Sequence, residues 1–257
     1  MTGYRELVVK ELLEAWRTYR LIVLALLFLA LGVTAPIVTK YLPDIINAFG
    51  PAGFEVQIPI PGVADVLDQL LKNIVQFGAL AAILLSMGSV ATERERGTAA
   101  FVLAKPVTRT AFLAAKLVAL GIEFAIAIGL AVAGAWLYTW LLFGPGRPAI
   151  LPWLELGAVI WLSTAVYVSI TFLGSVLMRS SLGAAGIGFL GLIVLSLLSI
   201  VPNFTSWLPA GLPAVAKSLA LRETSPDVDP VRTIVVSIVI AGVAIGLAWW
   251  RFRRMEL

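Results

Sequence analysis

The chain has 257 residues, of which 60% are hydrophobic and 13% charged, and its mean hydropathy is +0.98. Soluble domains are about 45–50% apolar and about 25% charged, so this composition argues against a water-soluble globule. Cysteine and histidine are both absent, which excludes a zinc site, a Ser-His-Asp triad, a Cys-His pair and an HExxH motif.

The first 20 residues are predicted to form an amphipathic helix, because apolar and charged residues alternate at spacings of three and four. The apolar face carries Tyr4, Val8, Leu12, Ala15, Trp16 and Tyr19, and the charged face Arg5, Glu6, Lys10, Glu14 and Arg17. We expect the aromatic residues to lie at the level of the lipid headgroups and the charges to face the cytosol. The alternative is a solvated helix that packs on the rest of the protein.

Six stretches are long and apolar enough to cross a membrane. A spanning helix needs about 20 apolar residues, because each residue adds about 1.5 Å and the hydrocarbon core is about 30 Å thick. The expected spans are 21–39, 73–92, 111–143, 155–178, 181–201 and 231–251. The fold class is therefore an all-α integral membrane protein with a single membrane domain, in which the long third span tilts or protrudes.

Two longer connections are expected on the outer side. Residues 40–72 read as a Pro- and Gly-rich loop followed by an interfacial helix, GVADVLDQLLKN, and residues 202–230 form a second outer loop that can dip back into the membrane. The other connection of note, residues 93–110, falls on the inner side.

The distribution of basic residues predicts the orientation. Thirteen of the 19 Lys and Arg residues fall on the side that holds both ends of the chain. By the positive-inside rule, both termini are expected in the cytoplasm, with the chain in the inner (plasma) membrane. The net charge of +4 then reflects contact with anionic lipid, and no nucleic acid partner is expected.

Glu123 is the one acidic residue well inside an expected span. An intramembrane carboxylate is a candidate functional residue. The structural alternative is a neutral carboxyl, or one paired with Ser86, Ser89 or Arg179.

The inner connection between the second and third spans, residues 87–116, holds most of the functional information. The second span runs into the charged sequence Glu93, Arg94, Glu95 and Arg96, Gly97 permits a break, and a short apolar turn follows at 99–103. Pro106 stops that turn, and Thr108 can cap the next helix. We expect a short helix across the cytoplasmic face that can seat in a groove on a soluble partner.

In this region the chain resembles the ABC-2 type permeases of ABC transporters, and within them the NosY-like branch. The resemblance rests on the run from Glu93 to Arg96, Gly97-Thr98, Pro106-Val107-Thr108-Arg109, and Phe112 with Lys116. Together with the amphipathic lead, six spans and long outer loops, it covers nearly the whole chain. The chain departs from the family in having Ala99 and Ala100 where bulkier residues are common.

The resemblance implies a connecting helix at 1–20 and a coupling helix within residues 94–105. It also implies two copies of the permease above two copies of a cytoplasmic ABC ATPase, and an exporter. ATP and Mg would bind in the partner ATPase, since this chain has no GxxxxGK[ST] loop and no cofactor of its own. The ATPase-coupling candidates are Glu93, Arg94, Glu95, Arg96, Gly97, Thr98, Pro106 and Arg109.

Two other functions remain open. The same machine could transmit force to an extracytoplasmic partner, for example in assembling a metalloenzyme, without itself transporting a substrate. An intramembrane enzyme is disfavoured, because the sequence offers no nucleophile, base or metal cluster; the chain is expected to be a non-catalytic membrane subunit.

Overall fold

The computed structural model describes residues 2–49, 61–97, 108–144, 149–201, 204–223 and 228–255, and within these the regular structure is entirely helical. The elements, in chain order, are α1 Thr2–Arg17, α2 Arg20–Phe49, α3 Val63–Ser86, α4 Ala91–Glu95, α6 Arg109–Phe143, α7 Ile150–Leu177, α8 Ser181–Leu198, the 3₁₀ turns η1 Thr205–Trp207 and η2 Pro209–Gly211, α9 Leu212–Leu221, and α10 Pro230–Arg253.

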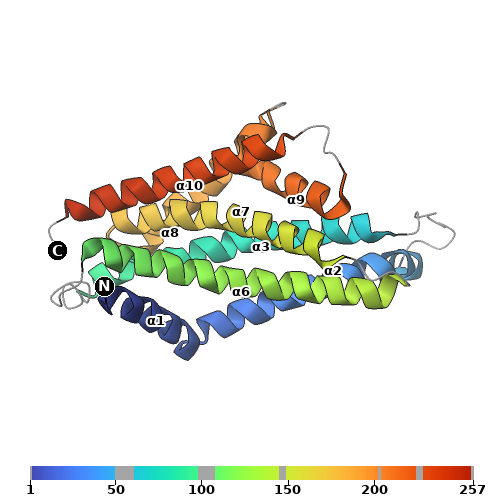
Figure 1. Ribbon diagram of the computed structural model, residues 1–257, viewed down its shortest axis with the longest axis horizontal. Helices are drawn as coiled ribbons and strands as arrows, with labels where there is room; N and C mark the ends of the chain where they lie inside the picture. The colour runs from blue at the N-terminus through green and yellow to red at the C-terminus, as the bar shows by residue number, and fades with distance from the viewer. Residues whose placement is uncertain are drawn as a thin grey trace.

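Six of these helical segments are long and apolar enough to cross a membrane, and both ends of the chain lie at the same end of the bundle (Figure 1). The six are α2, α3 continued through α4, α6, α7, α8 and α10. The all-α fold class and the number of spans predicted from hydropathy are therefore confirmed.

Two expected boundaries differ from the observed helices. We expected the first span to give way to a loop at residue 40, but α2 continues to Phe49 through Pro36 and Pro43. The tether that keeps it beside α6 is Lys40, whose ammonium donates a 2.7 Å hydrogen bond to the Leu142 carbonyl.

The interfacial helix expected before the second span is not a separate element. It is the first half of α3, which runs unbroken from Val63 to Ser86. Its start is fixed by Asp65, whose carboxylate accepts the Gly62 N–H at 2.8 Å. The apolar residues of this segment that we expected at the membrane surface are Val63, Val66, Leu67, Leu70 and Leu71. The last four are buried in the core, whereas Val63 is exposed.

The N-terminal helix packs on the bundle, which corresponds to the alternative left open by its sequence. α1 lies against α6 (Figure 1) with Ala15 completely buried. Val9, Leu13 and Trp16 stay exposed, together with Tyr19 in the turn that follows. Part of the predicted apolar face therefore meets protein, and other apolar side chains remain available to lipid.

The most extensive helix contact joins α2 to α6 and depends on small residues. A Cβ added at Gly32 would lie 2.1 Å from the Ala131 carbonyl oxygen, and one added at Gly134 would lie 3.1 Å from the side chains of Leu29 and Val33. Small residues allow membrane helices to approach this closely, where dispersion replaces the hydrophobic effect as the attraction. The same two helices are joined by Arg20–Glu123 and, about 30 Å further along by helical rise, by the Lys40 tether.

This contact gives a prediction for Gly32→Ala. The new methyl group meets main-chain atoms that cannot rotate away, so α2 and α6 must separate, and overpacking of this kind costs about 1–3 kcal/mol. We expect a lower thermal unfolding midpoint in mild detergent. Gly129→Ala on α6 is the matched control, because nothing lies within 4 Å of its added Cβ; equal midpoints for the two variants would contradict the account.

Candidate functional site

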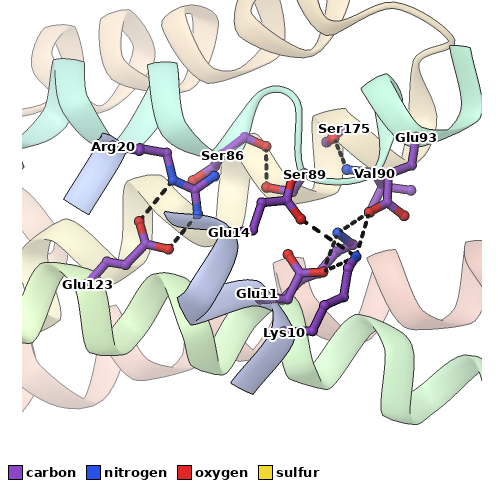
Figure 2. A network of polar contacts seen from close by, with 11 residues as sticks. Lys10, Glu11, Glu14, Arg20, Ser86, Ser89, Val90, Glu93, Glu123 and Ser175 are labelled. Atoms are coloured by element: carbon purple, nitrogen blue, oxygen red, sulfur yellow. Dashed lines mark hydrogen bonds and ion pairs between the residues drawn. The ribbon is translucent and has the colours of Figure 1, made fainter. Parts of the chain in front are cut away.

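A cluster of charged side chains joins α1, α4 and α6 at the end of the bundle that holds the termini (Figure 2). Its centre is Lys116, which is only 5% exposed. The ammonium donates to Glu11 at 3.0 Å and to Glu93 at 2.7 Å. Lys10 adds contacts of 3.2 Å to Glu11 and 3.7 Å to Glu93. One buried cation is thus shared by carboxylates from two different elements.

The charges in the cluster shift the titration of the two α1 residues. Burial opposes ionisation of Glu11, but the charge and hydrogen bond of Lys116, helped by Lys10, hold the pKa of that carboxyl below its ordinary value. Burial likewise opposes the charge on Lys10, yet Glu11 and Glu93 outweigh it and raise the pKa of the ammonium. Both groups are therefore stabilised in their charged forms.

Deeper along α6, Glu123 forms a bidentate ion pair with Arg20, the first residue of α2 (Figure 2). The Arg20 Nε donates to Oε2 at 3.1 Å and Nη2 to Oε1 at 2.5 Å. The Glu123 side chain is fully buried, and Arg20 is one-third exposed. The partners that we expected from the sequence, Ser86, Ser89 and Arg179, were wrong; the turn between α1 and α2 brings Arg20 there instead.

The turn that leads into α4 is fixed from the opposite side by α7. The hydroxyl of Ser175 accepts the N–H groups of Val90 and Ala91, both at 2.9 Å (Figure 2). The Arg94 guanidinium donates to the Val176 and Met178 carbonyls at 3.0 and 3.2 Å. Because a helix leaves its last carbonyls without intrahelical partners, Arg94 satisfies the end of α7 while it holds α4 in place.

The predicted coupling residues therefore divide by position. Glu93 and Arg94 point into the protein and hold α4, whereas Glu95, Arg96 and Gly97 are exposed. Gly97 has φ +69°, a left-handed conformation that glycine adopts without steric cost. Thr98, Pro106 and the turn predicted at 99–103 lie outside the described residues.

Arg109, also predicted to serve coupling, closes the end of α10. Its guanidinium donates to the carbonyls of Phe252, Arg253 and Met255 at 3.3, 3.0 and 2.7 Å. One residue earlier, the Thr108 hydroxyl accepts the Ala111 N–H at 3.1 Å, which confirms the predicted cap of α6. The start of α6 is thus joined to the C-terminal helix.

Sequence reasoning gave no role to Glu11, Lys116, Arg20 or Ser175. The first two carried a usable signal: Glu11 falls on the stripe of Tyr4, Val8, Leu12 and Ala15, and Lys116 interrupts an apolar helix. A charge on a buried stripe requires a buried partner. Ser175 carried no such signal, since serine is common in membrane spans.

A cavity of about 510 Å³ lies beside this network. It is bounded by charged side chains from α1, α4 and α6, and by Ser89, Thr92 and Ser181. Part of its wall belongs to α1, α2, α4 and α6, which the ion pairs hold together, and the rest to α3, the turn that follows it, and α8.

Two comparisons with known proteins agree with this architecture. A family model described as "ABC-2 family transporter protein" matches residues 5–257. The chain is also similar to the transmembrane protein YxlG of Bacillus subtilis (strain 168), with 30% identity over 256 residues and 96% of each chain covered.

The first prediction from this site concerns Lys116→Met. The change removes the ammonium that the mostly buried carboxylates of Glu11 and Glu93 share, and breaking a buried pair costs about 3–5 kcal/mol. We expect a clear fall in the thermal unfolding midpoint. The control is Arg222→Met, which removes the exposed ion pair with Glu155 and should cost less than about 1 kcal/mol. A smaller fall for Lys116→Met than for this control would contradict the role of the cluster.

The second prediction concerns acid. Because the folded pKa of Glu11 lies below its ordinary value of 4.5, this group stabilises the fold above pH 4.5, and its contribution is lost as pH falls through the folded pKa. Between pH 7 and pH 3 the wild-type unfolding midpoint should therefore fall more than that of Glu11→Gln. If the unfolding midpoints of the two proteins fall in parallel as pH is lowered, Glu11 contributes nothing to the loss of stability in acid.

Proposed function

This chain belongs to the ABC-2 family of transporter proteins, and we propose that it is the membrane-spanning permease subunit of an ABC exporter driven by a separate cytoplasmic ATPase. The observation that carries the proposal is the fixation of α4. It is held by α1 and α6 through Lys116 and by α7 through Ser175 and Arg94. A push on α4 would therefore move several helices together.

In this proposal Glu95 and Arg96 meet the ATPase, because they are the exposed charges at the end of α4. Thr98 and Pro106 stay predicted coupling residues. Glu93 and Arg94 act indirectly, by keeping α4 attached to the membrane helices. Complementary charge steers and registers such an interface, so reversal of the exposed charges should weaken docking.

The functional unit would hold two permeases and two ATPases, with ATP and Mg bound by the ATPases. Both termini would be cytoplasmic in the plasma membrane. The apolar faces of α8 and α10 would be covered by lipid or by the second copy; they include Leu190, Ile193, Leu197, Val235, Ile238 and Val239, which are all exposed in the single chain. Closed two-fold symmetry is the commonest arrangement of such subunits.

One observation favours force transmission to an extracytoplasmic partner as the second candidate function. The segment at the far end, α9, is bound to α3 by Lys217–Asp68 at 2.7 Å and to α7 by Arg222–Glu155 at 2.9 Å. At the opposite end of the bundle, α3 leads into α4, and α7 holds α4 through Ser175 and Arg94. Movement of α4 would therefore reach α9, with or without a transported substrate.

The proposal predicts the effect of reversing the exposed charges. The double variant Glu95→Lys, Arg96→Glu should reduce the amount of ATPase that co-purifies with the permease in mild detergent by about tenfold. The reason is that each reversed charge would face a like charge on the ATPase surface. The ATPase is identified by mass spectrometry through its GxxxxGK[ST] loop. Thermal unfolding should stay unchanged, since neither side chain is buried.

The matched control is Glu223→Lys, an exposed charge reversal just after α9 at the far end of the bundle. It should leave ATPase recovery at the wild-type level. If no ATPase co-purifies with the wild type, or if the α4 variant retains it fully, the proposed docking site is wrong.

A further inference from the structure

A second cavity, of about 770 Å³, lies between α3, α7 and α8 and is closed at the far end by η2 and α9. Figure 1 shows α9 beside these helices, away from the end that holds the termini. The volume falls in the range of about 300–1,000 Å³ that is typical of small-molecule sites. Along α3 it extends from Asp68 to Leu80, which is about 18 Å of helix.

The lining changes character along this length. The end near α9 carries Lys72, together with Lys217 in its ion pair with Asp68. These three side chains leave one uncompensated positive charge. The opposite end is bounded by Ala79, Leu80 and Leu192, so it is apolar.

Hydroxyl groups line the part of the cavity between the helices. Ser163 and Tyr167 on α7 are 5% and 6% exposed, and neither hydroxyl has a hydrogen-bond partner among the described residues. Both residues line the cavity, so their hydroxyls can donate to or accept from a polar group bound there.

Lys72 is the charge that can meet such a molecule. It is exposed, lines the cavity, and forms no ion pair with the described residues. Lys217 is already neutralised by Asp68 at 2.7 Å. An anionic group at this end would therefore pair with Lys72 in a charge-assisted contact.

We propose that this cavity binds a small amphiphile with one anionic head group, placed at Lys72, and an apolar tail that lies along α3 toward Leu80 and Leu192. The head group can be a phosphate, sulfate or carboxylate. If the proposed permease function holds, this amphiphile is the class of substrate that the protein moves. Binding itself does not require the ATPase, so the two proposals can fail separately.

The test uses a single thiol in this cysteine-free chain. Ser196→Cys places it on the cavity wall, and the purified permease is reconstituted in phosphatidylcholine nanodiscs without an ATPase. Labelling by a water-soluble maleimide is timed with and without dodecyl phosphate. We expect dodecyl phosphate to slow labelling at least tenfold and uncharged dodecanol to leave it unchanged. Glu223→Cys, outside the cavity, should label equally in all conditions.

Lys72→Gln in the same background should raise the dodecyl phosphate concentration needed for half protection about tenfold, because a hydrogen bond to a charged group is lost. Lys72→Arg should retain protection, and Arg5→Gln, an exposed charge on α1 outside the cavity, should not alter it. Equal protection by dodecanol, or unchanged protection in Lys72→Gln, would overturn the proposal.

The anionic head group and apolar tail can come from a bilayer lipid or from a free amphiphile. Nanodiscs of phosphatidylglycerol distinguish the two sources. Slow labelling in these nanodiscs without added dodecyl phosphate, reversed by Lys72→Gln, identifies the bilayer as the source. Fast labelling there, with protection by dodecyl phosphate retained, identifies a free amphiphile. Stimulation of ATP hydrolysis by dodecyl phosphate, once the ATPase is added, then tests transport independently of binding.

Discussion

The arrangement of the end of the bundle that holds the termini depends on one buried ammonium group. Lys116 is almost inaccessible to water, and it donates to carboxylates from α1 and from α4. In a low-dielectric environment an unpaired ammonium is costly, so the positions of the three elements constrain one another. Apolar packing alone tolerates sliding along a helix, whereas these contacts require a particular register.

Other polar contacts extend this constraint across the bundle. Ser175 and Arg94 join α4 to α7, Arg109 joins the start of α6 to the end of α10, and Arg20–Glu123 joins α2 to α6. The contacts of Ser175, Arg94 and Arg109 lie at helix termini, where main-chain groups lack intrahelical partners. The helix ends therefore complete one another at the end of the bundle that holds the termini, and a force applied at α4 would be spread over the bundle.

Hydropathy predicted the six spans because a bilayer demands long apolar helices and offers no alternative for the main chain. The residue types at single positions predicted that Thr108 caps the next helix and that Gly97 permits a break in the chain. The predicted end of the first helix was wrong, because Lys40 binds a carbonyl of α6 that is about 100 positions away in the chain. The interfacial helix merged with α3 because its apolar stripe found protein, and no hydropathy profile distinguishes protein from lipid.

The candidate site was harder to predict for the same reason. Glu93 and Glu95 look alike in sequence, yet Glu93 is partly buried against Lys116 and Glu95 is exposed. Glu123 pairs with a residue 103 positions earlier, so its partner emerges only when the neighbouring helices are known. The helical period offered a signal that we did not use, since it puts Glu11 on the apolar stripe of α1; it also puts Lys116 and Glu123, seven residues apart, on one face of α6.

The central claim is that α4 moves with α1 because Lys116 joins them, and a distance measurement tests it directly. Spin labels at Arg17→Cys and Arg96→Cys, both exposed, would report the α1–α4 distance by double electron-electron resonance in the otherwise cysteine-free chain. We predict one narrow distance distribution with Lys116 present and a broad or shifted one in the Lys116→Met background. Equally narrow, superimposable distributions in the two backgrounds would contradict the account.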